Sequence, residues 1–429
     1  MIDIQTTALS RRGLLGAGIL GAGLLAAPRF ARAAPTAAYP AIQNLLTDYV
    51  DGGKLAGAVA AIGFGQAPPQ FLARGRQSLD AATPIGADSL FRVYSMTKPI
   101  TGMAAMMLID EGKLRLDQPV SDILPKFARM EVLKSPTGAL DQVEPAARPI
   151  TIRHLLTHTA GLGYHIISTG PIQQAYIDAG LVPAAATRLP IPGLSGGKVL
   201  PSLAAFADRL ATVPLVYQPG TKWSYSVGLD LIGRVIEVVS GQPFDRFVTE
   251  RILQPCGMSE TGFTVAPALR ERLTSNYGVM GGVLIPLDPA KTSIFLTPPP
   301  YPFGGAGLVS SPRDYDRFLQ MLVGYGMIGK TRVMSERAVR LGTSNLLPAG
   351  VAGPDGRDFG AGGSVGKGDT AGIYGWGGAA GTIAFADLKR GIRAGFYTQY
   401  MPEGAYPIHT AFPAAVRADL MAAAGLKAA

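Results

Sequence analysis

Hydrophobic positions recur along the chain with two different periods, and each period predicts a type of element. Apolar residues at i, i+3, i+4 and i+7 bury one face of a helix, whereas short apolar runs bounded by Gly, Pro or Asp are typical of strands. The helical spacing predicts helices over residues 40–50, 95–110, 152–158, 203–212, 231–239, 315–322 and 411–426. The apolar runs predict strands over residues 56–64, 70–77, 377–386 and 392–400, the last two forming a hairpin.

The order of these elements predicts the architecture. Strands come early, helices fill the middle, and strands return late, which favours a sheet built from both ends of the chain with the middle inserted as a second lobe. We expect a sheet lobe of about residues 40–115 and 305–429 and a mainly helical lobe of about residues 116–304. The Pro-rich residues 285–307 carry little regular pattern and are expected to form a long surface loop or lid.

The first 33 residues predict an export signal. Ser10, Arg11 and Arg12 precede an apolar run over residues 14–27, and small residues flank Arg32 at a plausible cleavage point, as in a twin-arginine signal peptide. The run is shorter than the roughly 20 residues that a membrane span needs. We therefore expect an exported protein, periplasmic or secreted, without a membrane span.

Charge and cysteine content narrow the function classes. Lys and Arg exceed Asp and Glu by 39 to 30, a modest excess without a basic run interleaved with aromatic residues, so no nucleic-acid partner is expected. Cys256 is the only cysteine, which excludes a disulfide within the chain. This fits a protein that folds in the cytoplasm before export.

Ser95 and Lys98 are the first candidate catalytic residues. Pro99 is tolerated only in the first turn of a helix, so the helix over residues 95–110 begins no earlier than about Ser95. Residues three apart on a helix face the same way, which brings the Lys98 amine within reach of the Ser95 hydroxyl. Positive potential at the helix start favours an alkoxide on Ser95 and a neutral amine on Lys98. The pattern thus predicts a nucleophile and its base.

Two further S-x-x-K matches lack this context. Ser195 and Lys198 lie in a Pro/Gly-rich loop over residues 189–201, where nothing fixes the two side chains together. Ser364 and Lys367 belong to a glycine-rich run that formally matches G-x-S-x-G. A nucleophile elbow needs an apolar strand before the serine and a helix after it, and neither is present, so a strand edge or loop is expected.

Three histidines have a spacing similar to that of a zinc-binding helix. His154 and His158 are spaced i, i+4 and His165 follows, but Leu155 stands where the H-E-x-x-H motif has its glutamate. We expect structural histidines at a helix end, and no metal site.

Three short motifs, taken together, resemble a known superfamily. Ser95-Met-Thr-Lys98, Tyr225-Ser-Val227 and Trp376-Gly-Gly378, in this order, resemble the active-site motifs of the serine β-lactamase and penicillin-binding-protein superfamily. The most similar branch is the family VIII carboxylesterases, which resemble class C β-lactamases. Residues 150–162, 252–258 and 304–310 are also typical of this scaffold, so the resemblance spans nearly all of the chain after residue 33.

The resemblance implies a fold and a set of roles. The fold would be α/β of the α+β type, with a central antiparallel sheet flanked by helices. Ser95 would be the acylated nucleophile, Lys98 would take or share its proton, and Tyr225 would activate first the serine and then the deacylating water. The backbone N–H groups of Ser95 and Ala379 would form the oxyanion hole. No metal or organic cofactor is expected.

Trp376, Gly377, Gly378 and Val227 would contact the substrate, and two of them depart from the β-lactamase motifs. Val227 replaces an asparagine that would grip the side chain of a β-lactam. Trp376 replaces a lysine that would attract the β-lactam carboxylate, a contact of roughly 1.5–3 kcal/mol. An apolar tryptophan beside the serine suits an uncharged ester, so a small-molecule ester is the expected substrate.

Other functions stay open on the sequence alone. The same site could serve a β-lactamase, a D-amino-acid peptidase or amidase, or an acyltransferase, and a non-catalytic cell-wall-binding protein could use the same scaffold. Lys98 and Tyr225 titrate as a pair, and the sequence does not assign their shared proton to either residue.

Overall fold

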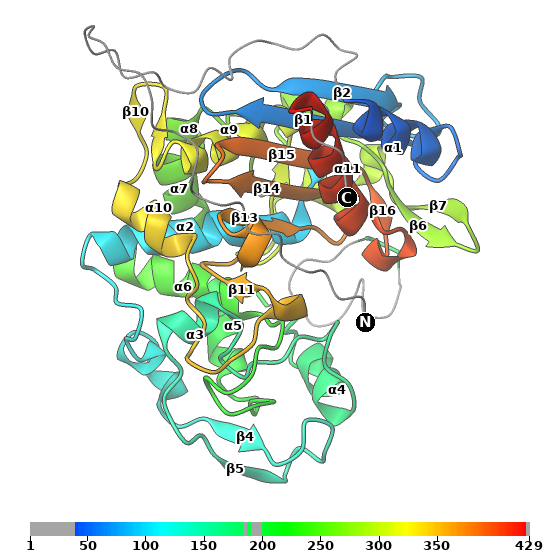
Figure 1. Cartoon of the computed structure of the whole chain (residues 1–429). Coiled ribbons are helices and arrows are strands. Elements are labelled where there is room, and N and C mark those ends of the chain that lie inside the picture. Colours follow the sequence, from blue (N-terminus) through cyan, green and yellow to red (C-terminus); the bar gives the residue numbers. More distant parts are fainter. Residues whose placement is uncertain (1–38, 183–186, 190–199, 426–429) are drawn as a thin grey trace, which may run out of the picture. The chain divides into compact units, whose positions relative to one another are not determined.

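The computed structural model describes residues 39–182, 187–189 and 200–425 (Figure 1). Three predicted features lie outside the described residues: the signal peptide, the S-x-x-K match of Ser195 and Lys198, and most of the loop over residues 189–201.

A seven-stranded antiparallel sheet combines both ends of the chain, as the sequence predicts. The strands follow the spatial order β11-β12-β13-β14-β15-β1-β2, and β1 lies in register with β15, with Val59 opposite Tyr397. Their bounds are β1 Gly57–Phe64, β2 Gln70–Gly75, β11 Asp358–Phe359, β12 Ser364–Val365, β13 Ile373–Gly377, β14 Ile383–Asp387 and β15 Ile392–Tyr397.

Both faces of β1 are buried, because successive side chains of a strand point to opposite faces. Ala58, Ala60 and Ile62 pack against α1 (Pro40–Val50) and α11 (Ile408–Ala423), the two end helices that lie over the sheet in Figure 1. Val59 and Ala61 belong instead to the large core that also contains α2 (Thr97–Asp110) and α9 (Pro312–Val323). This two-sided burial explains the continuous apolar run of β1.

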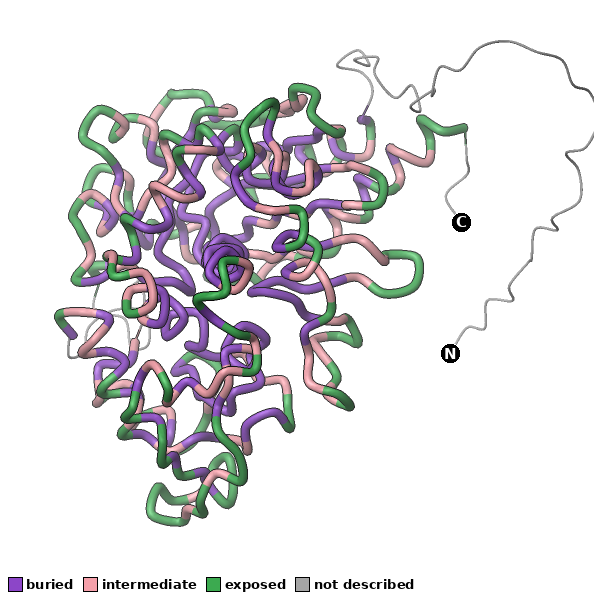
Figure 2. Tube along the Cα trace, turned by 90° about the vertical axis from the view of Figure 1, so that its left-hand side faces the viewer, coloured by how far each residue is buried: buried purple, intermediate pink, exposed green. Residues whose placement is uncertain are grey.

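Helix α2 is the central element of that core. Residues 97–108 are all buried, so the helix is covered on every side and not only on the one face that its spacing predicts. Figure 2 shows this burial as a purple helix seen nearly end-on in the middle of the tube. The sheet, α6 (Gly228–Ser240) and α10 (Glu336–Gly342) surround it. The start of α2 is thereby held in a fixed position.

The middle of the chain contributes many of the helices, while its division from the sheet as a separate lobe stays a prediction. Its helices are α3 Ile152–Leu156, α4 Pro171–Asp178, α5 Leu203–Leu210, α6, α7 Phe244–Val248 and α8 Gln254–Cys256. The small ladders outside the main sheet are β4 Glu131–Leu133 with β5 Val143–Pro145, β3 Phe91–Arg92 with β8 Val309–Ser310, β9 Met327–Ile328 with β10 Thr331–Arg332, and β6 Asn276–Met280 with β7 Val283–Asp288 and β16 Tyr400–Met401.

Three local predictions are wrong. The glycine-rich residues 377–386 form no single strand, because the chain turns between Gly378 and Thr382 to separate β13 from β14. Residues 285–307 are no free surface loop: they begin within β7 and become buried from Tyr301 onward. Helix α3 ends at Leu156, because His158 adopts a left-handed backbone with φ of 56°.

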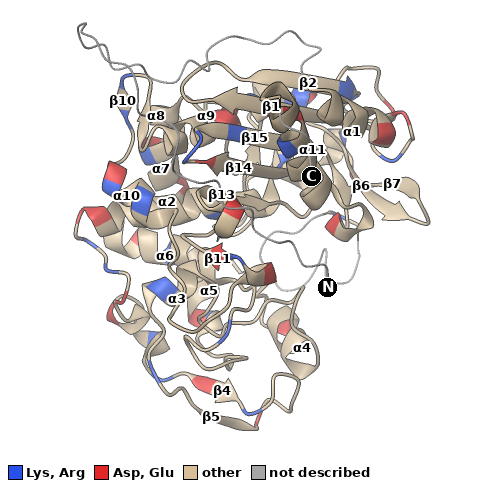
Figure 3. Ribbon diagram, in the orientation of Figure 1, with Lys and Arg blue, Asp and Glu red and all other residues tan. Residues whose placement is uncertain are grey.

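Positively and negatively charged residues are interspersed over the elements of the structure (Figure 3). No helix in the described ranges is long and apolar enough to cross a membrane.

Candidate active site

Ser95 lies in a short 3-10 turn, η1 (Tyr94–Met96), which leads directly into α2. Tyr94, just before the serine, has φ of 40°, a left-handed conformation that costs a non-glycine residue energy and is typical of functional sites. Its buried ring meets Phe295 edge-on at 6.1 Å, and the Asn276 amide donates to its hydroxyl at 3.4 Å. Tertiary contacts thus hold the strained residue that sets the direction of Ser95.

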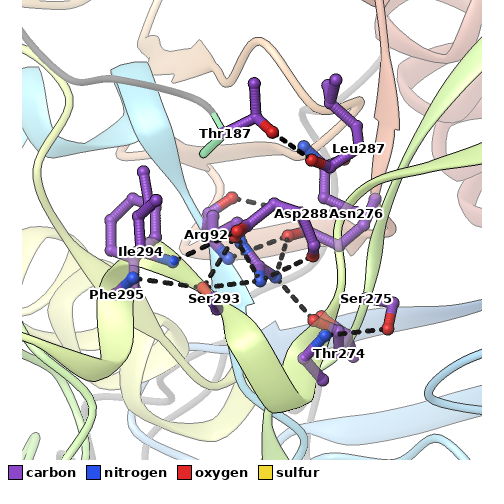
Figure 4. Close-up of polar contacts among 12 residues, drawn as sticks. Arg92, Thr187, Thr274, Ser275, Asn276, Leu287, Asp288, Ser293, Ile294 and Phe295 are labelled. Atoms are coloured by element: carbon purple, nitrogen blue, oxygen red, sulfur yellow. Dashed lines mark hydrogen bonds and ion pairs between the residues drawn. The ribbon is translucent and has the colours of Figure 1, made fainter. Parts of the chain in front are cut away.

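A buried polar network anchors β3, the strand before this turn (Figure 4). The Arg92 guanidinium is fully buried and donates to Asp288 Oδ2 at 2.6 Å, to the Thr274 carbonyl at 2.6 Å and to Ser293 Oγ at 2.9 Å. A buried ion pair is costly unless its hydrogen bonds are satisfied, and here they are. The network ties β3 to β7 and to the segment after it, so the nucleophile turn rests on a rigid base.

The structure brings Ser95, Lys98 and Tyr225 together. Lys98 Nζ donates to Ser95 Oγ at 3.1 Å, and the Tyr225 hydroxyl, just ahead of α6, lies 2.8 Å from the same oxygen. Lys98 Nζ also lies 4.6 Å from the centre of the Tyr225 ring. Ser95 and Tyr225 are half-buried, whereas Lys98 is fully buried. Two groups that can exchange a proton with Ser95 therefore lie within hydrogen-bond distance of its partly accessible oxygen.

Trp376 joins this cluster from β13. Its indole Nε1 donates to the Tyr225 oxygen at 3.3 Å, and the two rings lie 5.8 Å apart and tilted by 32°. The residue that replaces the motif lysine is thus more than an apolar wall, since its N–H can stabilise negative charge on the Tyr225 oxygen.

A ring of further aromatic residues encloses Tyr225. Its ring lies 4.7 Å from His158, 5.7 Å from Tyr164 and 6.2 Å from Trp223. His158 is buried and its Nδ1 lies 3.1 Å from Ser226 Oγ, while burial holds the pKa of this histidine well below its usual range. His158 is therefore neutral and packs against Tyr225 without adding a charge.

Lys98 is held by residues that motif reasoning missed. The Gly305 carbonyl accepts from Lys98 Nζ at 2.6 Å, and the Gly305 N–H donates to Asp230 Oδ1 at 2.9 Å. Asp230 stands in the first turn of α6, where an acidic residue is ordinary because it suits the helix dipole. Only the tertiary fold reveals that its carboxylate points into the core.

The turn after β13 lies against the nucleophile segment. A Cβ atom on Gly378 would lie only 2.5 Å from the Val93 carbonyl oxygen, so this close approach requires glycine. The Thr382 carbonyl accepts from the Gly378 N–H at 2.7 Å and from His409 Nε2 at 2.9 Å, which fixes the turn that carries Ala379. The first N–H groups of a helical turn lack internal acceptors, and Ser95 lies in such a turn. Both predicted oxyanion-hole donors thus belong to segments that meet.

The other predicted substrate contacts differ in accessibility. Trp376, Gly377 and Ala379 are half-buried and remain open to a ligand, whereas Val227 is fully buried at the start of α6. The Val227 side chain therefore does not reach the open part of the site.

The alternative motifs carry structural roles. Ser364 Oγ donates to the Gly375 carbonyl at 3.2 Å within the sheet, and Lys367 pairs with Asp358 at 2.8 Å, so they form no second S-x-x-K pair. His154 is part of a capping box, in which its Nδ1 accepts from the Thr151 N–H at 3.2 Å. Among the residues that the structure covers, no three His, Cys, Asp or Glu side chains group into a metal site.

Comparison with known proteins connects this geometry to a family. The family model described as Beta-lactamase matches residues 42–417. Protein Rv1367c of Mycobacterium tuberculosis (strain ATCC 25618 / H37Rv) is 36% identical over 309 residues, which cover 71% of each chain. Esterase EstB of Burkholderia gladioli is 33% identical over 375 residues, covering 82% of this chain and 88% of EstB.

A solved structure supports the same assignment. EstCE1, described as a hydrolase with promiscuous acyltransferase activity, superimposes with a TM-score of 0.69 and 26% identity, covering 88% of this chain and 97% of its own. The match over most of the sequence, the shared fold and the clustered motifs lead to one conclusion: the chain belongs to the beta-lactamase family.

Proposed function

We propose that this protein is a serine hydrolase that cleaves small carboxylic esters through an acyl-serine intermediate at Ser95. The observation that carries the proposal is the position of Ser95 Oγ, 3.1 Å from Lys98 Nζ and 2.8 Å from the Tyr225 hydroxyl, on a rigid and strained turn. Activation of a serine by adjacent bases is what acyl transfer requires.

Acylation follows from this arrangement. Ser95 Oγ attacks the ester carbonyl carbon while its proton passes to the Lys98–Tyr225 pair. The N–H groups of Ser95 and Ala379 stabilise the oxyanion, each contributing about 3 kcal/mol in typical hydrolases. The intermediate collapses when the C–O bond to the alcohol breaks, and the alcohol leaves with the proton that the pair had received. An acyl-Ser95 ester remains.

Deacylation reverses the proton movements. Tyr225 takes a proton from a water molecule, the hydroxide attacks the acyl carbonyl, and Ser95 Oγ leaves with the proton returned. The products are a carboxylic acid and free Ser95. No step requires a metal or an organic cofactor.

The choice of an ester over a β-lactam rests on Trp376. Its position beside Tyr225 offers an apolar ring and a neutral N–H in place of a cation, and nothing about this residue favours a carboxylate on the substrate. The similarity to esterase EstB supports the same choice.

Acyl transfer to an alcohol is the second candidate function. In that reaction an alcohol replaces water in deacylation, and the residues keep their roles. The similar hydrolase EstCE1 has promiscuous acyltransferase activity, and the aromatic residues around Tyr225 provide an apolar surface on which an alcohol could compete with water. Product analysis with an added alcohol distinguishes a transferase from a hydrolase.

Two parallel assays test the proposal. We expect turnover of p-nitrophenyl butyrate to exceed that of nitrocefin, and a fluorophosphonate probe to label the wild type but not Ser95→Ala. Ser364→Ala is the matched control, because this serine belongs to the formal G-x-S-x-G match but bonds only within the sheet. Faster turnover of nitrocefin would favour a β-lactamase, and absence of labelling in the folded wild type would favour a non-catalytic binding protein.

We also propose that residues 1–33 direct export by the twin-arginine route. Arg11 and Arg12 before the apolar run over residues 14–27 support this. Sequencing the N-terminus of the mature protein should place the cleavage near Ala33. Loss of export in an Arg11→Lys, Arg12→Lys double variant would support the route, and unchanged export would contradict it.

A further inference from the structure

Asp230 is a buried acid that the mechanism above does not use. Its side chain is only 1% exposed, and its Oδ1 accepts from the Gly305 N–H at 2.9 Å. The carboxylate presses so closely on Gly305 that a Cβ atom at that position would lie 2.6 Å from Asp230 Oδ2. Only glycine allows this contact, so the Asp230 carboxylate and the segment that contains Gly305 pack as one unit.

The same segment holds Lys98 from its other side. The Gly305 carbonyl accepts from Lys98 Nζ at 2.6 Å, a short distance of the kind that a charged donor gives. Lys98 Nζ also lies 4.6 Å from the centre of the Tyr225 ring, where a cation is favoured over a neutral amine. Both contacts suit an ammonium group.

The charges around this unit are few. The titratable groups that face Asp230 are Lys98 from α2 and the buried Tyr164 and Tyr301. Burial raises the pKa of both tyrosines well above the usual range, so neither is charged at neutral pH. His158, which faces Lys98, is neutral because burial lowers its pKa. Among the described groups, the cation facing the Asp230 carboxylate is therefore Lys98.

We propose that Asp230 is a positioning residue whose charge keeps the proton shared by Lys98 and Tyr225 on Lys98, and thus makes Tyr225 the base. This inference rests on the proposed function. The Ser95 proton then moves directly to the Tyr225 oxygen, on which Trp376 Nε1 donates a hydrogen bond, and Lys98 acts as the fixed positive charge beside both. Burial raises the pKa of the Asp230 carboxyl to about 6, so this group is still mainly ionised at pH 7. Its negative charge opposes the neutral Lys98 that the helix start alone favours.

Asp230→Asn separates charge from geometry. The asparagine Oδ1 can still accept from the Gly305 N–H, but the negative charge is gone. A nearby opposite charge shifts protonation equilibria by about one to three units. We therefore expect the alkaline limb of the pH profile of Ser95 labelling by a fluorophosphonate to move down by about one to two pH units. At a pH above that limb, labelling slows by about 10- to 100-fold.

Asp316→Asn is the matched control. Asp316 is also a buried aspartate, but it pairs with Arg393 at 2.9 Å between α9 and β15, away from the active-site motifs. This variant should lower the melting temperature and leave the pH profile unchanged. Asp230→Asn should instead shift the pH profile and leave the melting temperature nearly unchanged.

Each outcome of these labelling experiments either supports or overturns the proposed role of Asp230. A wild-type profile for Asp230→Asn, or slower labelling without a shift of the profile, overturns the proposal and leaves the esterase function intact. If Asp230→Asn does not fold, Gly305→Ala, which pushes the carboxylate away from Gly305, should give the same shift, and an unchanged profile overturns the proposal. A folded wild type that the probe does not label overturns the proposed function, and this inference with it.

Discussion

At the scale of single residues, Trp376 combines two roles that its sequence position alone does not separate. Trp376→Phe keeps an aromatic ring against Phe359, which lies 5.2 Å away, but removes the N–H that donates to the Tyr225 oxygen. A hydrogen bond to a charged group is typically worth about 1.5–3 kcal/mol. We expect kcat for ester hydrolysis to fall by roughly 10-fold or more with little change in KM, measured by steady-state kinetics.

Trp376→Lys completes this test. The new cation should raise the ratio of nitrocefin to ester turnover, because it could attract the β-lactam carboxylate. An unchanged ratio would show that residue 376 does not set substrate preference through charge.

We expect His154 to make the stability of the protein sensitive to acid. Burial lowers the pKa of His154 from 6.5 to about 4. As the pH falls below 6.5 the unfolded chain takes up this proton while the folded chain does not, so the free energy of unfolding decreases until the pH reaches about 4. His154→Gln retains a side chain that can complete the capping box with Thr151 but cannot titrate in this range.

We therefore expect His154→Gln to lose about 1–2 kcal/mol less free energy of unfolding than the wild type between pH 7 and pH 5, measured by urea denaturation. His154→Ala is the control for the cap and should cost about 1 kcal/mol at pH 7. Equal acid sensitivity of the wild type and His154→Gln would show that His154 does not cause the loss of stability at low pH.

At the scale of elements, α1 receives its N-terminal cap from the other end of the chain. Tyr39 offers no capping side chain, and the Asp419 carboxylate of α11 instead accepts from the N–H groups of Ala41 at 2.8 Å and Ile42 at 3.0 Å. Asp419→Ala should lower the free energy of unfolding by about 1–2 kcal/mol, the range for loss of a helix cap. Asp48→Ala, an exposed acid on α1, should change it by less than about 0.5 kcal/mol.

The elements also show what the sequence could predict. Helices with a clear apolar stripe and local caps, such as α6 and α9, appear close to their predicted ranges because their signals are local. The turn between β13 and β14 was missed because its glycines resemble a strand pattern, and their φ angles and contacts depend on neighbours distant in sequence. The same holds for the segment of Gly305, which bonds to Lys98 of α2 and to Asp230 of α6.

The residues of the candidate site likewise fall into those that the sequence predicted and those that it did not. Ser95, Lys98, Tyr225 and Trp376 were found because each lies in a short motif, and the structure brings them into contact. Asp230 was missed because nothing local distinguishes it from an ordinary acid at a helix start. Its role depends on Gly305, 75 residues later in the chain.

At the scale of the whole molecule, the site should unfold together with the rest of the chain. The described residues from 39 onward belong to one compact unit, and α2 lies in its large core. The chain has two tryptophans, Trp223 and Trp376, and both are next to Tyr225, so tryptophan fluorescence reports on the site. We expect the fluorescence and far-UV circular dichroism transitions in urea to coincide. A fluorescence transition at lower urea would reveal a site that loosens first.

The pairing of β1 with β15 has a consequence for synthesis. Val59 of β1 can pair with Tyr397 of β15 only after the ribosome has synthesised Tyr397. At typical translation rates of about 5–20 residues per second, the ribosome needs roughly 15 to 70 seconds to make the chain between them. During that interval the apolar β1 has an unpaired edge that could join the β1 strand of another nascent chain. Yield of soluble protein should therefore depend on expression rate, with slow synthesis and available chaperones favouring correct closure.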